Sequence, residues 1–117
     1  MSTPLLREQW PFYLDSFSKH NQGRPTELKI FDYIEVENRL PLNGIYLEEA
    51  GEDSPRIEIL LGGAAGETPH ITHKITHVRS LLPLTDGGRY AGLVIEDNQG
   101  LKTTLHLAAP QQLNTGH

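Results

Sequence analysis

The sequence predicts a mainly β protein, α+β by strict count, in which an N-terminal helix precedes a strongly bent antiparallel sheet or small barrel of six to seven strands. Three observations predict this fold. One apolar stripe at helical spacing lies near the start of the 117-residue chain. Short segments of strand character follow, and glycine-containing or proline-containing turns separate them. A single helix over an open end of such a sheet would give these apolar faces one shared core.

The helix is expected over about residues 7–20. Its apolar stripe falls at positions i, i+3, i+4 and i+7, which are Trp10, Tyr13, Leu14 and Phe17. Phe12 lies off this stripe, so we expect it to be partly exposed. Pro11 fits a first turn, where its missing N–H is not needed, and Gly23 can adopt the left-handed conformation that follows a helix.

The expected strands lie within about residues 26–110. They cover residues 26–36, 42–49, 56–61, the histidine segment 70–77, and then 78–84, 90–96 and 101–107. Residues 51–55 read as a hairpin-like loop, and the glycine-rich residues 62–66 interrupt the sheet as a flexible connection. Short turns at residues 86–88 and 97–100 predict that the last three strands form an antiparallel meander. Residues 1–117 are expected to form one domain, with residues 111–117 as a frayed tail.

Composition limits the classes of function. There are no cysteines, so thiolate zinc sites and thiol catalysis are excluded, and we expect a protein of a reducing, cytoplasmic compartment. The formal charge is −5. No apolar run approaches the ~20 residues that span a bilayer, so no membrane association is expected. Acidity disfavours nucleic acid as a partner, because the phosphate backbone is repelled and the cations do not form a run.

The motif W-x-x-Y-L-x-x-F-S, from Trp10 to Ser18, with His20 and Gly23 after it, resembles the start of a bacterial family of small single-domain proteins of unknown function. The resemblance continues through "LPLNGI", "RIEILLG", "HITHKI" and "DNQGLKTTLHL", and it therefore covers nearly the whole chain. It implies a fold but no activity. The order of helix and bent sheet also looks like Sm-like and SH3-like small barrels.

Histidine supplies the candidate metal ligands, which are His70, His73, His77 and His106. Three of them lie in the segment HITHKITH, where two isoleucines and two threonines favour a strand. On a strand, His73 and His77 share a face but stand ~13 Å apart at ~3.3 Å per residue, too far to bind one ion. His73 would therefore need ligands from neighbouring strands, for example His106, Glu58 or Asp32. Such neighbours are not visible in the sequence.

The preferred functional hypothesis is a non-enzymatic accessory or protein-interaction module with no cofactor. Its partner would be an unidentified protein, or a second copy that pairs through a sheet edge to give a homo-oligomer. A metal-binding protein or enzyme that uses His73 is one alternative. An Sm-like binder of single-stranded RNA is another, although the Asp-x-x-x-Asn and Arg-Gly motifs are missing and Tyr90 follows Arg89.

Overall fold

The computed structural model describes residues 3–30, 33–64 and 67–108. Within these residues the elements are η1 (Arg7–Gln9), α1 (Trp10–Asn21), β1 (Pro25–Ile30), β2 (Tyr33–Glu48), β3 (Arg56–Leu61), β4 (Ile71–Ile75), β5 (Val78–Asp86), β6 (Arg89–Asp97) and β7 (Lys102–Leu107). The strands form one antiparallel sheet in the order β4-β3-β2-β1-β7-β6-β5. The sheet is strongly bent but not closed, so the predicted bent sheet is confirmed and the closed barrel is not formed.

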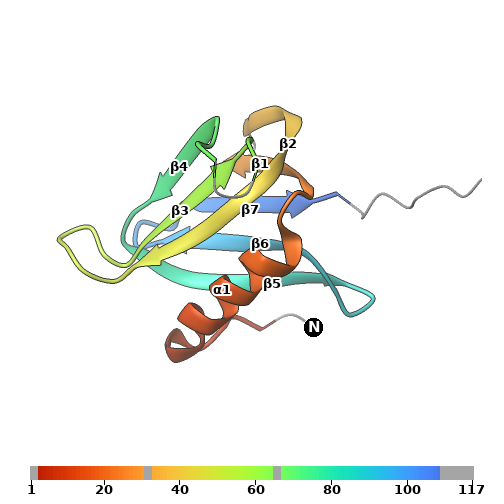
Figure 1. The fold of residues 1–117 in the computed structure, drawn as a ribbon. Helices are drawn as coiled ribbons and strands as arrows, with labels where there is room; N and C mark the ends of the chain where they lie inside the picture. Colours follow the sequence, from red (N-terminus) through yellow and green to blue (C-terminus); the bar gives the residue numbers. More distant parts are fainter. Residues whose placement is uncertain (1–2, 31–32, 65–66, 109–117) are drawn as a thin grey trace, which may run out of the picture.

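Strand β2 is 16 residues long and belongs to both halves of the sheet. Its first part pairs with β1, and its second part pairs with β3. An irregular register between Leu42 and Gly44 marks the change of partner, as expected where a bulge bends a strand. In Figure 1 the long strand β2 crosses in front of β7 and β6, so the half of the sheet that contains β2, β3 and β4 and the half that contains β5, β6 and β7 face each other across the core.

The structure differs from the predicted strand over residues 26–36, because the chain reverses within it. Ile30 of β1 pairs with Tyr33 of β2, and β2 then runs on to Glu48 without the predicted break before residue 42. The apolar alternation continues on both sides of the reversal, and neither glycine nor proline marks it. Phe31 and Asp32, which the predicted strand included, lie outside the described residues.

The predicted helix is confirmed, with its first three residues in the 3-10 turn η1. Trp10, Leu14 and Phe17 are at most 2% exposed, whereas Phe12 is 79% exposed as its place off the stripe predicts. Pro11 occupies the first turn of α1, and Gly23 has a φ of 85°. The apolar stripe therefore fixes which face of the helix meets the sheet.

The core follows the alternation of the strands. Every second residue of β3 is buried, and β7 shows the same period with Thr103, Leu105 and Leu107 inside. The predicted meander of β5, β6 and β7 is confirmed by their two antiparallel ladders. Sheet faces that are apolar on one side only can be buried against each other and against α1, which gives one core.

Arg24 joins the end of α1 to the far half of the sheet. Its guanidinium donates hydrogen bonds to the Asn21 side chain (2.8 Å) and to the carbonyls of Tyr90 (3.0 Å) and Ala108 (2.7 Å). Burial, together with the nearby Arg89, lowers the pKa of Arg24 below its ordinary value. The planar group thus spans three segments, each of which offers an oxygen atom.

We expect Arg24→Lys to lower the free energy of unfolding by about 2–4 kcal/mol, because a single ammonium cannot reproduce the fork of three bonds. Urea unfolding followed by circular dichroism measures this. The control is Arg79→Lys, at an exposed pair with Glu96, which we expect to cost under about 1 kcal/mol. Equal losses in the two variants would contradict the role given to Arg24.

Tyr13 makes stability sensitive to alkaline pH. Its ring packs against Phe17 and Tyr90, with ring centroids 6.0 and 6.1 Å apart, and burial raises the pKa of Tyr13 to about 12. Between pH 10 and 12 the unfolded chain loses the Tyr13 proton while the folded chain keeps it, so the free energy of unfolding falls as pH rises.

We expect Tyr13→Phe to make the free energy of unfolding fall less steeply when it is measured between pH 9 and 12. Tyr46→Phe, at a ring that is 52% exposed, should keep the wild-type slope.

Candidate functional site

Ser18 holds α1 against the side of β2 that lies opposite β3. Its hydroxyl oxygen accepts a hydrogen bond from the Ile45 N–H (2.9 Å) and donates one to the Ile45 carbonyl (2.8 Å). Ser18 is buried, at 7% exposure, on the same helix face as Leu14 and Phe17. Both groups of the hydroxyl are thereby engaged by main-chain atoms, which makes Ser18 a structural residue and not a nucleophile.

The bond to Ser18 also reveals how the rest of this β2 edge is oriented. Ile45 pairs with Ile59 in the ladder, yet its N–H and carbonyl point to Ser18 and not to β3. Antiparallel ladders alternate between residues that bond across the pair and residues that point outward, so Leu47 points outward like Ile45. No hydrogen bond to the main chain of Leu47 from this side is found among the described residues.

A groove of about 210 Å³ opens where α1 and this edge of β2 diverge. Its lining comes from the helix and from the end of the strand, and consists of Pro11, Leu14, Asp15, Ser18, Ile45, Tyr46, Leu47 and Glu49. Of the apolar lining residues, Leu14 and Ile45 are buried and Leu47 is half-buried, and polar and apolar atoms share the accessible surface of the groove. The groove therefore combines a half-buried leucine, an outward-facing strand edge and two carboxylates.

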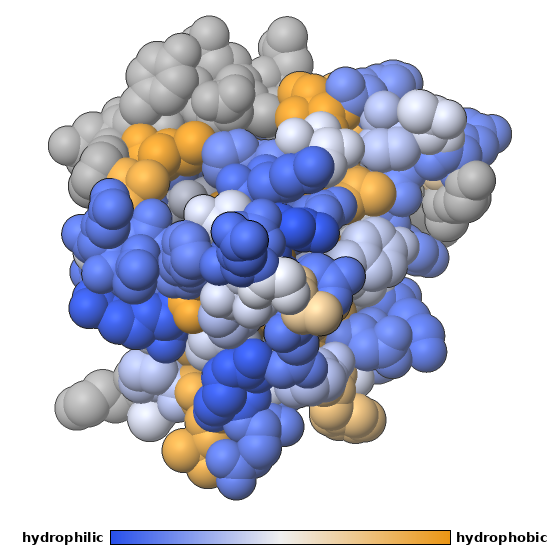
Figure 2. Space-filling view, turned by 90° about the vertical axis from the view of Figure 1, so that its left-hand side faces the viewer, coloured by the Kyte–Doolittle hydropathy of each residue, from blue (hydrophilic) through white to orange (hydrophobic). Residues whose placement is uncertain are grey.

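Among the residues that the structure describes, three large hydrophobic ones are exposed, and one of them lines the groove. They are Leu6 (61%), Phe12 (79%) and Tyr46 (52%). Leu6 precedes η1, Phe12 is the neighbour of the groove residue Pro11, and Tyr46 lines the groove itself. The end of the molecule that carries the β2–β3 loop is mostly hydrophilic, with small separate hydrophobic patches (Figure 2). Single exposed hydrophobic residues are common on protein surfaces, so it is the place of Tyr46 in a groove that distinguishes it.

The Tyr46 ring has a defined place on β2. A Cβ atom added at Gly44 would lie 2.7–2.9 Å from the hydroxyl, Cε2 and Cζ atoms of Tyr46. The ring therefore extends back along the strand over Gly44, where only glycine leaves room for it. This packing holds an exposed aromatic side chain in one orientation, as in the aromatic covering of glycines in other sheets.

Two exposed ion pairs flank the groove. Arg7 bonds to Glu49 (2.6 Å) and Lys19 to Asp15 (3.1 Å). The Arg7 guanidinium also lies 4.4 Å from the centre of the Trp10 ring, which is a cation–π contact. All four charged side chains in these pairs are 45–72% exposed, so the pairs are weak and a competing charge can replace them.

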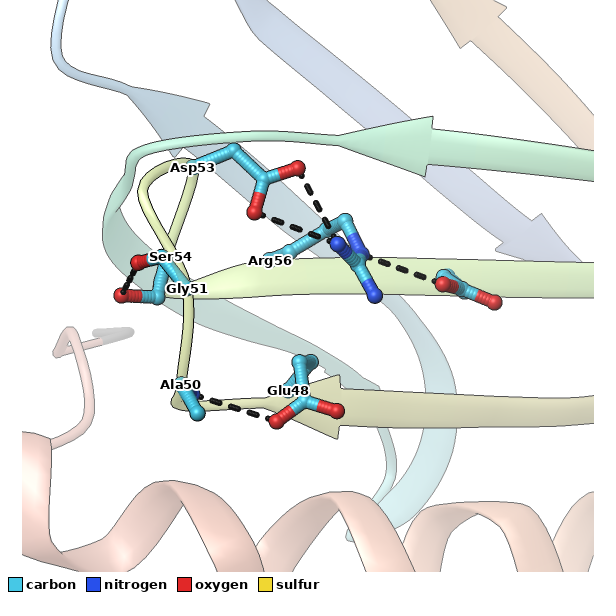
Figure 3. A network of polar contacts seen from close by, with 7 residues as sticks. Glu48, Ala50, Gly51, Asp53, Ser54 and Arg56 are labelled. Atoms are coloured by element: carbon cyan, nitrogen blue, oxygen red, sulfur yellow. Dashed lines mark hydrogen bonds and ion pairs between the residues drawn. The ribbon is translucent and has the colours of Figure 1, made fainter.

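The β2–β3 loop at this end of the molecule is held by a separate polar network (Figure 3). Arg56 binds both carboxylate oxygens of Asp53 (3.0 and 3.1 Å) and also binds Glu58 (3.1 Å). The hydrogen bond from Arg56 lowers the pKa of the Asp53 carboxyl. The Asp53 carbonyl in turn accepts a bond from the His77 N–H, which ties the loop to the start of β5. These acidic residues thus stabilise a turn.

The four histidines named as metal ligands belong to different parts of the sheet and its connections. His70, His77 and His106 are exposed, and His106 lies on β7, where it pairs with Glu27 and Gly92. The predicted strand over residues 70–77 is confirmed in its central part as β4, whereas His70 precedes it and His77 follows it with a φ of 51°. Among the described residues no three histidine or acidic side chains gather to hold a metal ion. Metal binding through these residues stays a prediction for elemental analysis.

His73 is half-buried on β4 opposite Ile59, and it lines a second cavity of about 190 Å³. Of its predicted ligands, Glu58 pairs instead with Lys74, and Asp32 lies outside the described residues. The cavity places His73 with Asp97 of β6. One Asp97 oxygen already accepts the N–H groups of Gln99 and Leu101 (2.9 Å each), so this carboxylate closes the β6–β7 turn.

Sequence reasoning missed the groove residues, although one signal was available. Ser18 is a polar residue on the buried helix face, and such a residue needs a hydrogen-bond partner from another element. Asn43 is a similar case, since its buried amide donates to the carbonyls of Gly62, Ala64 and Glu67 and so holds the glycine-rich connection. Which partner each residue meets depends on register, which no local pattern reports.

Helix, bent seven-stranded sheet and side groove define a small α+β protein of one continuous core. The chain belongs to the family of unknown function DUF5335, whose model matches residues 1–116. This confirms the resemblance to a family of unknown function. No curated protein and no solved structure matches the chain, so the likeness to Sm-like and SH3-like barrels stays a prediction. In the part of the chain that the structure describes, no helix has the length and hydropathy to cross a bilayer.

Proposed function

We propose that this protein is a non-enzymatic protein-interaction module that binds its partner at the groove between α1 and β2. The observation that carries the proposal is the exposed ring of Tyr46 in the lining of this groove, together with the exposed ring of Phe12, which follows the lining residue Pro11 in the chain. Exposed aromatic residues at a concave site are the usual anchors of protein contacts. The groove is also smaller than the roughly 300–1,000 Å³ of common small-molecule sites, which favours a side chain or peptide segment as occupant.

Site-specific photo-crosslinking tests this proposal. A photoreactive phenylalanine analogue replaces Tyr46 or Phe12, and the cells that produce the native protein are irradiated. We expect the same discrete adduct from both positions, identified by mass spectrometry. The control position is His106, which is exposed on β7 and does not line the groove. Equal labelling from His106, or no adduct from either groove position, would remove the proposal.

Self-association through β4 is a second candidate. β4 is five residues long and ends the sheet on one side. At the other end of the sheet, β5 is partly covered, because Leu81 accepts a bond from the Leu5 N–H and Val78 donates one to Pro55. A strand that ends a sheet is a template for pairing with a second copy, and antiparallel pairing about a two-fold axis gives a closed dimer.

Analytical ultracentrifugation tests the second candidate. We expect the wild-type protein to form dimers with rising concentration, and a Thr72→Lys/Thr76→Lys variant to weaken the dimer at least tenfold by placing like charges on both copies. The control is Thr85→Lys, at an exposed position on β5. A wild-type protein that stays monomeric at millimolar concentration would rule self-association out.

A further inference from the structure

We propose that the occupant of the α1–β2 groove is an extended, basic segment of a partner protein, which adds to β2 as a short antiparallel strand at Leu47. This inference rests on the proposed function, and it specifies the chemistry of the partner. Two independent observations lead to it. One is the direction in which the main chain of β2 points, and the other is the charge around the groove.

The β2 edge selects an extended main chain. Its outward groups are already bound at two places, at Leu42 by Gly23 and Arg24, and at Ile45 by Ser18. Leu47 is the next outward-facing residue, and it lies inside the groove. A peptide in β conformation offers one N–H and one carbonyl at the spacing that Leu47 requires. Strand addition to a sheet edge is a common way to bind such peptides.

The groove walls select an apolar side chain next to that main-chain contact. In an added strand, alternate side chains point to opposite faces, so one packs beside the half-buried side chain of Leu47. The next points outward, past the Tyr46 ring that Gly44 holds in place. A space of about 210 Å³ accommodates one apolar side chain together with the backbone that carries it.

Charge selects a basic partner. Within residues 7–19 and 46–52 there are five carboxylates and two cations, which are Glu8, Asp15, Glu48, Glu49 and Glu52 against Arg7 and Lys19. Two of the carboxylates, Asp15 and Glu49, line the groove. Their pairs with Lys19 and Arg7 are solvent-exposed, so arginine or lysine from a partner can replace them at little cost. An acidic segment would meet repulsion at both walls.

A phage-displayed library of random decapeptides, selected on the folded full chain, tests the inference. We expect the enriched peptides to carry an excess of Lys and Arg around one apolar position. Synthetic versions should shift the NMR signals of the Leu47 and Tyr46 amides, slow hydrogen exchange at the Leu47 amide, and bind more weakly as salt rises. N-methylation of the peptide amide that meets Leu47 should weaken binding about tenfold.

Two sets of variants test the main-chain contact at Leu47 and the charge of the groove separately. Leu47→Pro removes the outward N–H but no bond of the β2–β3 ladder, so it should lose about tenfold in peptide affinity, while Leu47→Val keeps it. The double variant Asp15→Asn with Glu49→Gln changes no main-chain group, and it should make peptide affinity less dependent on salt. This variant tests the role of charge even if Leu47→Pro fails to fold. The control pair is Asp86→Asn with Glu67→Gln, which does not touch the groove.

Different results would overturn this inference and the proposed function. Peptides that shift Leu47 and Tyr46 but show no basic excess, or that bind Leu47→Pro as well as Leu47→Val, overturn this inference and leave the groove as the docking site. Signals at Leu47 that move with protein concentration alone overturn it in favour of a second copy. If the selected peptides shift neither residue, and Tyr46 and Phe12 give no crosslink in cells, the proposed function falls as well.

Discussion

The rest of the structure depends on the change of partner within β2. A strand has two edges, and β2 uses one edge for β1 in its first part and the other for β3 in its second part. Each part therefore leaves one edge without a neighbouring strand. A buried edge must have its N–H and carbonyl groups satisfied, so the second part of β2 needs a partner that is not a strand. The helix α1 and the turn after it meet this requirement, through Ser18 at Ile45 and through Gly23 and Arg24 at Leu42.

This requirement explains why the helix lies where it does. The apolar stripe of Trp10, Leu14 and Phe17 determines the face that α1 buries, but hydrophobic contact alone is not directional. Ser18 and Arg24 supply the direction, because each bonds to groups at fixed positions on the sheet. The hydroxyl of Ser18 sets the register of α1 along β2, and the guanidinium of Arg24 fixes the helix end against β6 and β7. Helix position is thus determined by polar contacts within an apolar interface.

The sequence predicts where helices and strands form, but it does not predict which of them lie next to one another in space. Periodicity predicts α1 from Trp10 to Phe17 and predicts β3 from Ile57, Ile59 and Leu61, since burial repeats with the period of each element. It fails at the reversal between Ile30 and Tyr33, where the apolar alternation continues and neither glycine nor proline marks a turn. The groove was beyond reach for a related reason. Its residues come from positions about 30 apart in the chain, and only the register of β2 against Ser18 brings Leu14 and Leu47 together.

The same geometry accounts for the difference between the histidine segment and the groove. HITHKITH concentrates chemically versatile side chains, yet β4 contains only His73, because His70 precedes the strand and His77 follows it with a φ of 51°. The groove contains no unusual residue type, yet it joins an outward-facing main chain, the half-buried Leu47 and two carboxylates within one small volume. A binding surface depends on which groups the fold brings together, and not on how many reactive side chains a segment contains. In this fold these features meet beside β2. Ser18 binds the outward main-chain groups of β2 at Ile45, whereas no hydrogen bond to those of Leu47 is found among the described residues.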